Sequence, residues 1–485
     1  MAMVLSNSYA ELGGAFYQST PPEPVKDPKL FLWNSPLAEA LQLERILDAE
    51  SPQLAQFFSG NQLLPGSNPM ALAYAGHQFG HFVAQLGDGR AHLLGELIDR
   101  SGELKELQLK GSGPTPYARN GDGRYALGPA IREFIMGEAL YAMGIPTTRA
   151  LAVITTGETV YRETPNQGAV LSRIATSHLR VGSFEYFAAR ENLQALQQLC
   201  DFAIRRHYPE LQGRGEERFV LLLEQVMDRQ IDLVVEWLRI GFIHGVMNTD
   251  NTTISGETID YGPCAMMGVY NPDTVFSSID RAGRYAFGNQ PAIAQWNMAR
   301  LAETLLPLIH RDEKRAVEIA SRCLEGFSDL FNDRYRRMMA RKIGITQPQP
   351  SDAKLISELL QCLQQKRLDY TESFDRLTRS LTSPSLAQQL GRELGDWYEQ
   401  WQARLSTDGE LEQAQSVMRQ TNPLVIPRNQ QMEQVIRIST QQGDASAAEQ
   451  FLEVLRSPYT LTDKTEPYQR TSPDADQGYR TFCGT

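Results

Sequence analysis

Cysteine is scarce in this chain of 485 residues, and the cysteines it has are scattered. They are Cys200, Cys264, Cys323, Cys362 and Cys483, and no two of them form a Cys-x-x-Cys pair. A structural zinc site or a dense disulfide framework is therefore not expected. This usage is typical of a protein that works in a reducing compartment, and we expect a cytoplasmic location.

Basic tracts, long apolar runs and a leader sequence are missing as well. The formal charge is −11, and no basic tract is available to neutralise phosphates, which argues against binding to nucleic acid. No stretch approaches the roughly 20 apolar residues of a membrane span. Residues 1–7 lack the basic start and the apolar core of a signal peptide. We expect a soluble monomer of two or three domains, with a composition ordinary for a globular protein.

The most informative absence is that of one aspartate. Residues 244–262 resemble a kinase catalytic loop that runs into a metal-binding Asp-Tyr-Gly. Kinase loops place a proton-accepting Asp two residues after the His and a metal-holding Asn seven residues after it. Asn251 fills the second position, but Val246 fills the first, and valine cannot accept a proton. Either the chain is catalytically dead, or Asp250 performs different chemistry on a nucleotide.

The same stretch predicts a metal site from local geometry. Residues 251–254 and 257–260 are rich in Thr and Ile, and Ser255-Gly256 between them is typical of a two-residue hairpin turn. In such a hairpin Asn251 faces Asp260, with Cβ atoms roughly 4.5–5.5 Å apart. An amide oxygen and a carboxylate at that spacing suit Mg²⁺ that is also held by phosphates and water. A solvated surface hairpin is the alternative.

The chain divides into a β-rich part and a helical part. Strands are expected over 81–86, 91–98, 104–109, 150–155 and 169–174, with one helix over 129–143. Helices are expected over 184–207, 216–240, 293–309, 314–344, 352–381 and 385–405, and near 430–438 and 447–455. This order predicts an α+β, bilobal protein-kinase-like fold. Its parts are an N-terminal extension with a β-rich lobe (1–175), a helical lobe (176–420) and a C-terminal extension (421–485).

Candidate phosphate-binding residues follow the same order. Gly87 and Gly89 would let the backbone approach phosphates, and Arg90 adds a charged donor, although Gly-Asp-Gly is also a common turn. Lys110 ends a strand just downstream, where kinases keep their phosphate-binding lysine. On the helix that follows, Glu133 lies on the side opposite Ile131 and Ile135, so it is better placed than Glu138 to pair with Lys110.

Two further features are not needed by an ordinary kinase. Residues 117–124 form a glycine-rich polar insertion between the lysine strand and the glutamate helix. Arg173 ends an apolar run, where a lone arginine needs an anionic partner or a route to solvent, and Arg180 follows near the expected lobe junction. Extra arginines beside the cleft could hold phosphates in an arrangement different from that of kinases.

Taken together, these motifs resemble those of the selenoprotein O family, in a bacterial, cysteine-containing form. The similarity runs over almost the whole chain, and its distinctive segments are 74–80, 87–90, 109–113, 120–124, 245–251 and 260–263. The resemblance implies a kinase-like fold that lacks the usual catalytic aspartate and binds ATP in a reversed orientation. It also implies transfer of AMP to Ser, Thr or Tyr hydroxyls of proteins, with release of pyrophosphate. UTP stays open as a second donor.

The resemblance assigns roles by matching position. The residues implied to contact the nucleotide are Gly87, Gly89, Arg90, Lys110, Asp122, Gly123, Arg173 and Arg180, with Glu133 paired to Lys110. Asn251 and Asp260 would hold Mg²⁺ or Mn²⁺, with Asp260 also near the phosphates, and Asp250 would accept the proton. Two other functions stay open: a kinase that moves the γ-phosphate with Asp250 as base, and a nucleotide-binding scaffold without catalysis.

Cys483 matches the position of the selenocysteine or cysteine that some members carry near the C-terminus. Some bacterial relatives pair that residue with a cysteine near the position of Phe276, and no cysteine stands there in this chain. Cys264 is the nearby candidate. We expect a free thiol at Cys483, because the expected compartment is reducing.

Overall fold

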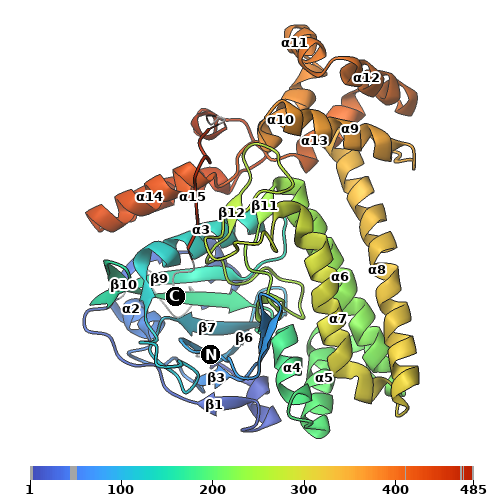
Figure 1. The fold of residues 1–485 in the computed structure, drawn as a ribbon. Helices are drawn as coiled ribbons and strands as arrows, with labels where there is room; N and C mark the ends of the chain where they lie inside the picture. The colour runs from blue at the N-terminus through green and yellow to red at the C-terminus, as the bar shows by residue number, and fades with distance from the viewer. Residues whose placement is uncertain (1–3, 44–51, 410, 470–471, 473, 483–485) are drawn as a thin grey trace.

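The computed structural model describes residues 4–43, 52–409, 411–469, 472 and 474–482. Within them the β-rich part forms one eight-stranded antiparallel sheet (Figure 1). Its order is β1 (Tyr17–Ser19), β3 (Met70–Leu72), β6 (Ala91–Ile98), β7 (Leu104–Lys110), β10 (Pro165–Ala175), β9 (Arg149–Tyr161) and β2 (Lys29–Trp33), with β8 (Tyr125–Ala126) paired to β10. The strands expected over 91–98, 104–109, 150–155 and 169–174 all lie in this sheet.

Apolar residues cover both faces of the sheet. Since successive residues of a strand point to opposite faces, neighbours on one strand belong to different apolar clusters. Leu94 and Ile154 belong to one apolar cluster, which also contains residues of α1 (Ser35–Ala40) and α2 (Pro52–Ser59). Their neighbours Leu93 and Val153 belong to a second cluster, which contains the core of α3 (Leu127–Ala142). The sheet is therefore held between α3 and the N-terminal helices.

The helical part follows the sheet in the chain (Figure 1). Its first helices are α4 (Val181–Ala188), α5 (Leu193–His207), α6 (Arg218–Ile240), α7 (Gln290–Ile309) and α8 (Glu313–Lys342). The later ones are α9 (Asp352–Gln365), α10 (Tyr370–Ser380), α11 (Pro384–Leu394), α12 (Asp396–Asp408), α13 (Leu411–Thr421), α14 (Asn429–Gln442) and α15 (Ser446–Leu455). In the described ranges no helix combines the length and the apolar character that crossing a membrane requires.

Three expected helices are each divided in two. The expected helix over 184–207 is α4 and α5, that over 352–381 is α9 and α10, and that over 385–405 is α11 and α12. A residue with positive φ lies at each break: Glu191 at 52°, Arg367 at 53° and Gly395 at 60°. This left-handed conformation redirects the chain, and apolar spacing alone does not reveal it.

A small hairpin lies outside the main sheet. It consists of β4 (Gly76–Gln78) and β5 (His81–Val83). The strand expected over 81–86 is therefore shorter than predicted, and it pairs with β4 and not with the large sheet. His77 N–H donates to the Thr249 hydroxyl at 2.7 Å, and Phe79 N–H donates to Asn248 Oδ1 at 3.0 Å. The hairpin therefore packs on the loop between β11 (Phe242–Ile243) and β12 (Ala265–Met266).

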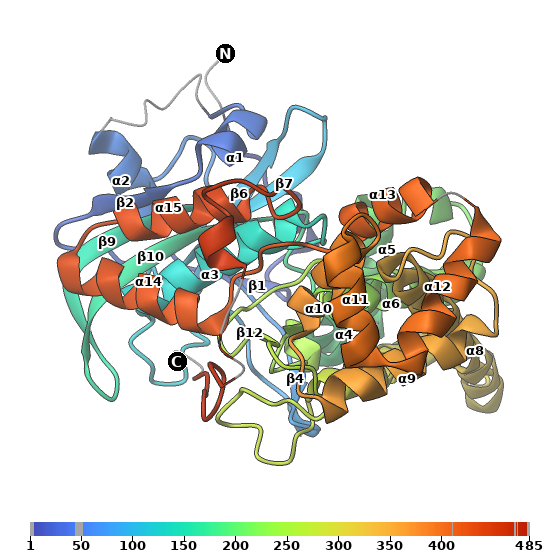
Figure 2. The ribbon, with the colours of Figure 1, turned by 90° about the horizontal axis from the view of Figure 1, so that it is seen from above.

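The C-terminal segment returns to the sheet part of the molecule. Figure 2 shows α14 and α15 beside α3. Arg132 of α3 forms an ion pair with Glu433 of α14 and donates to the Tyr479 hydroxyl at 3.3 Å. Farther along the tail, Thr481 N–H donates to the Phe276 carbonyl at 2.8 Å. The end of the chain thus contacts both α3 and the loop that follows β12.

The environment of Cys264 does not favour reactivity. Its thiol is free and buried, and it donates to the Tyr261 carbonyl at 3.3 Å. Burial raises the pKa of this thiol to about 12, so the reactive thiolate is rare at neutral pH. Cys483, for which we expect a free thiol, lies outside the described residues.

Close packing between α4 and the chain just before β4 gives a first prediction. A Cβ at Gly182 would lie 2.2 Å from the Ala75 carbonyl, whereas one at Gly326, inside α8, would meet nothing within 4 Å. We expect Gly182→Ala to lower the free energy of unfolding by about 1–3 kcal/mol, the cost of overpacking. The matched control Gly326→Ala should raise it by about 0.5–1 kcal/mol. Urea unfolding of both variants measures this, and an unchanged Gly182→Ala protein would contradict it.

Candidate nucleotide-binding and catalytic site

One carboxylate, that of Asp260, joins the sheet to the loop between β11 and β12. Lys110 Nζ lies 2.9 Å from Asp260 Oδ1, and Arg173 Nη2 lies 2.6 Å from the same oxygen. Arg180 Nη1 approaches Asp260 Oδ2 at 3.5 Å. Burial by itself would raise the pKa of Asp260, but Lys110, Arg173 and Arg180 outweigh it and hold that pKa well below its usual range.

Glu133 completes this ion-pair cluster from α3. It accepts from Lys110 Nζ at 2.8 Å and from Arg173 Nη2 at 2.6 Å, and it lies on the helix face that the sequence indicated. Burial opposes ionisation of Glu133, yet Arg173 and Lys110 hold its pKa below the usual value. Burial, followed by the charge of Arg173, lowers the pKa of Lys110. The lone arginine in the apolar run therefore has two anionic partners.

Strand register explains why these side chains meet. In the β7–β10 ladder Leu171 pairs with Lys110, and Arg173 pairs with Gln108. Because residues two apart on a strand share a face, Gln108, Lys110 and Arg173 project to one side of the sheet. That is the side covered by α3, which supplies Glu133.

Asp88 is a buried member of the site that the sequence analysis did not single out. It lies between the two glycines of the Gly-Asp-Gly turn, with only 3% of its surface exposed. Its carboxylate accepts from Gln108 Nε2 at 3.1 Å and from Leu72 N–H at 3.3 Å, and Arg180 Nη2 lies 3.6 Å away. The sequence signal for Asp88 is a charged residue inside a glycine turn between two strands.

The glycines beside Asp88 are required by packing. A Cβ at Gly87 would lie 2.4 Å from the Tyr117 ring, and Gly87 has φ of 91°; a Cβ at Gly89 would lie 2.9 Å from the Tyr117 carbonyl. The turn is thus covered by the first residue of the polar insertion.

The Arg90 guanidinium carbon lies 4.7 Å from the centre of the Tyr125 ring, and the same ring lies 5.0 Å from Lys110 Nζ.

Asp122 lies on an exposed part of the polar insertion and does not contact the ion-pair cluster. Its carboxylate accepts from Arg162 Nη1 at 2.8 Å and Nη2 at 3.0 Å, and hydrogen bonds from Arg162 lower its pKa. The next residue, Gly123, accepts from Gly113 N–H at 3.2 Å, which folds the insertion back onto the chain just after Lys110. Arg162, from the turn between β9 and β10, was not indicated by the sequence.

The hairpin expected over residues 251–260 is not formed, and this prediction of the local geometry is wrong. Thr253 bridges to Arg180 and Thr258 bridges to Thr147, so each half pairs with a different part of the chain. Asn251 ends a short 3₁₀ turn, and its side-chain Nδ2 donates to the Val246 carbonyl at 3.0 Å. The turn propensity of Ser255-Gly256 was outweighed by pairing with distant segments, a tertiary effect that a local pattern does not contain.

Asp250 is held by the small hairpin. Gln78 Nε2 donates to Asp250 Oδ2 at 3.2 Å, while Asp250 Oδ1 is buried and without a hydrogen-bond partner among the described residues. Burial raises the pKa of Asp250 to about 6, against the stabilising hydrogen bond from Gln78. A carboxylate with one unsatisfied oxygen and a pKa near neutrality has the properties of a general base.

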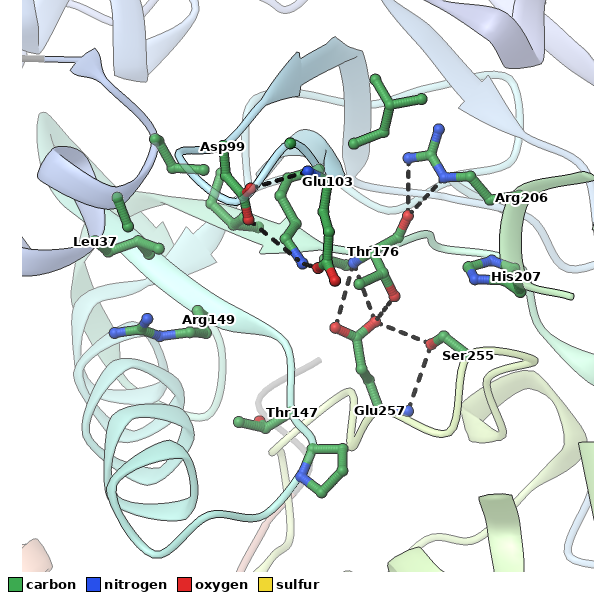
Figure 3. Close-up of a pocket in the computed structure, with 18 of the residues that line it drawn as sticks. Leu37, Asp99, Glu103, Thr147, Arg149, Thr176, Arg206, His207, Ser255 and Glu257 are labelled. Atoms are coloured by element: carbon green, nitrogen blue, oxygen red, sulfur yellow. Dashed lines mark hydrogen bonds and ion pairs between the residues drawn. The ribbon is translucent and has the colours of Figure 1, made fainter. Parts of the chain in front are cut away.

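A pocket of about 890 Å³ lies elsewhere, between α5, the end of α3 and the turn between β6 and β7 (Figure 3). Glu257 stands in it and accepts from the Thr176 hydroxyl at 2.5 Å and the Ser255 hydroxyl at 2.9 Å. None of the residues assigned to nucleotide or metal lines this pocket in the described part of the chain. The candidate site is therefore defined by the charged cluster and not by this cavity.

Comparison with known proteins places the whole chain in one group. A family model described as protein adenylyltransferase SelO matches residues 1–456. The chain is 53% identical to the protein nucleotidyltransferase YdiU of Teredinibacter turnerae, over 100% of both chains. It is 52% identical to that of Anoxybacillus flavithermus, over 99% of this chain and 98% of the relative. The similarity therefore includes every segment that builds the site.

The depressed pKa values of Glu133 and Asp260 predict a pH effect on stability. A group whose pKa is lowered by folding stabilises above its unfolded pKa, and this contribution is lost as pH falls. We expect the free energy of unfolding to fall as pH decreases below about 4.5, where unfolded carboxyl groups take up protons. Glu133→Gln should lower that energy at pH 7 by about 3 kcal/mol, because it removes one partner from a buried cluster.

Urea unfolding at pH 7 and at pH 4 measures both effects. The matched control is Glu39→Gln, which removes an exposed partner of Arg100 and should cost at most about 1 kcal/mol. A loss from Glu133→Gln no larger than that of the control would show that the cluster does not stabilise the fold. An identical acid dependence in Glu133→Gln and the unchanged protein would contradict the pKa argument.

Proposed function

This chain belongs to the SelO family and is a protein nucleotidyltransferase, and we propose that it transfers AMP from ATP to Ser, Thr or Tyr hydroxyls of proteins. The proposal rests on the cations around Asp260 and on the residue at the position of the kinase base. Three cations converge on Asp260 from the sheet side, while Val246 occupies the position of the kinase base. Such a site can hold a triphosphate but lacks the kinase means of activating an acceptor at the γ-phosphate.

We further propose that the molecule is a two-lobed, kinase-like enzyme. The sheet ends with β10 at Ala175 and the helices start with α4 at Val181, which supports a boundary near 175 between the two lobes. Segment 421–485 would be an extension that braces α3, since α14 and α15 pack on that helix. The nucleotide would then lie between the lobes, where Asp260 meets the sheet.

The cationic residues suit the distal phosphates of a reversed nucleotide. Lys110, Arg173 and Arg180 are all buried, with 8%, 3% and 4% of their side-chain surface exposed, so the phosphates that reach these cations would enter first. Arg180, Arg90 and the insertion around Asp122 and Gly123 would flank the same end of the nucleotide. The α-phosphate would then be left toward the mouth, beside Asp250.

A divalent cation fits the remaining donors. Asn251 donates through Nδ2, which leaves its amide oxygen as an acceptor for a cation, and the Asp260 side chain keeps 23% of its surface exposed. Among the described residues no cluster of three or more histidine, cysteine or acidic side chains could hold a metal without help. Asn251 and Asp260 would therefore hold Mg²⁺ or Mn²⁺ together with the phosphates. When bound, the ion neutralises charge on the phosphate oxygens.

Asp250 would act as the base. Its carboxylate takes the proton of the acceptor hydroxyl as that oxygen forms a bond to the α-phosphorus. The bond from the α-phosphorus to the bridging oxygen breaks, and pyrophosphate leaves. Gln78 holds one carboxylate oxygen and leaves the other without a partner, so the second oxygen is available for the proton.

ATP labelled in the α- or the γ-phosphate tests the reaction directly. We expect the α-label, and not the γ-label, to appear on protein, and Asp260→Asn to abolish the transfer because it removes a charged metal ligand. Asp273→Asn, at an exposed aspartate, serves as the control and should keep the activity. Label from the γ-phosphate on protein would establish a kinase instead, and no label from either phosphate would indicate a scaffold.

The pKa of Asp250 predicts the pH profile of transfer. Since a protonated carboxyl cannot accept a proton, the rate at saturating ATP should fall as pH drops below about 6. Gln78→Leu removes a donor that favours the ionised form, so the acid limb should move to higher pH. Asp250→Asn should reduce the rate by about 10²–10⁴-fold. An acid limb that stays in place in Gln78→Leu would contradict the assignment of Asp250 as base.

A further inference from the structure

The hairpin of β4 and β5 has two faces with different neighbours. Gly76 and Gln78 point to one side of β4, and His77 between them points to the other side. The first face touches the proposed base, because Gln78 donates to Asp250 and a Cβ at Gly76 would lie 2.8 Å from Asp250 Oδ1. Exposed His81 pairs with Gln78 in the register and so stands on the same face.

The other face of the hairpin meets an aromatic and cationic surface on α7 and the loop before it. The His77 ring lies 5.0 Å from Phe82, its partner in the register, and 5.2 Å from Trp296. The guanidinium carbons of Arg284 and Arg300 lie over the Trp296 ring at 4.7 and 4.9 Å. Figure 2 labels the strand β4, and a Cβ at Gly80, in the turn after this strand, would lie 3.6 Å from the guanidinium carbon of Arg284.

Charges at this surface favour an anionic partner. The Nε atoms of Arg284 and Arg300 are buried and have no hydrogen-bond partner in the described ranges. Of the nearby acids, Asp280 accepts two backbone N–H groups, and Glu185 is taken by His77 and Thr249. Among the described residues Arg300 pairs with the Glu303 carboxylate, itself 54% exposed, and its charge also acts on Glu185. The two arginines stand in a chain whose formal charge is −11.

We propose that these residues form the docking surface for the acceptor protein. The surface, which we call the hairpin face, consists of Phe82, Arg284, Trp296 and Arg300. The segment on either side of the modified hydroxyl would lie across it, and segments with Asp or Glu next to the hydroxyl would be favoured. This inference rests on the proposed function, because it assumes that the hydroxyl is delivered to Asp250.

Such a surface has to bring the hydroxyl to Asp250 and also bind the residues beside that hydroxyl. A hydroxyl at Asp250 would lie on the Gln78 side of the hairpin, and a residue a few positions away in the same extended segment would reach Phe82 and Trp296 on the other side. Phe82 is 43% exposed and offers apolar contact. Guanidinium groups stacked on an aromatic ring are held in plane and can bind a carboxylate through two hydrogen bonds. The binding energy thus comes from residues that flank the hydroxyl and not from the hydroxyl itself.

Three peptides of equal length, each with one Tyr flanked by Glu, Gln or Lys, test the proposal with the full-length enzyme. With α-labelled ATP, kcat/KM should follow the order Glu, Gln, Lys, with roughly a ten-fold advantage of Glu over Gln from one charge-assisted contact. In the double variant Arg284→Gln, Arg300→Gln, that ratio should approach one. The matched control is Arg337→Gln, which removes an exposed arginine paired with Asp333 on α8 and should keep the ratio.

The same peptides with Phe in place of Tyr separate docking from chemistry, since they bind without accepting AMP. Their dissociation constants should show the same order and the same loss of preference in the double variant. Equal affinity for the three peptides, or a preference for Glu that survives in the double variant, would overturn the proposal. A Glu preference in binding without any transfer of α-label would leave the docking surface standing and overturn the proposed reaction instead.

Discussion

Ionisation of Asp260 is the constraint on which the rest of the structure depends. Together with Glu133, its carboxylate neutralises Lys110 and Arg173, two cations of the sheet in a site shielded from water. Such charges are stable inside a protein only with partners at hydrogen-bonding distance. Asp260 itself has φ of 63°, a left-handed conformation that costs a residue other than glycine about 1 kcal/mol. The ion pairs therefore hold the loop between β11 and β12 in a conformation that the backbone of Asp260 does not favour.

The same cluster gives a physical account of how the site could change state. Asp260 binds Lys110 and Arg173, and under the proposed function a triphosphate with its metal would offer those cations other anions. Exchange of partners costs little when each buried charge remains compensated. Under the proposed function little reorganisation would therefore accompany binding.

Several parts of the site follow from short stretches of sequence. Lys110 at the end of a strand and Glu133 on the next helix were expected to meet, since strand order and helix period are local properties. Asp88, Gln78 and Arg162 were not singled out. Each gains its role from a partner far along the chain: Asp88 from Arg180, Gln78 from Asp250, and Arg162 from Asp122. No spacing rule connects such pairs.

The sequence by itself determined that a β-rich part precedes a helical part, because burial of apolar residues at a period of two or 3.6 depends on neighbours in the chain. It also determined that Val246 removes the kinase base. Only the tertiary structure decided how the loop of residues 251–260 folds, since Thr253 and Thr258 form bridges to Arg180 and Thr147, from other parts of the chain, and the local turn propensity is outweighed. The same holds for the ionisation of Asp250, whose pKa is set by burial beneath the hairpin of β4 and β5, a contact between residues far apart in the chain.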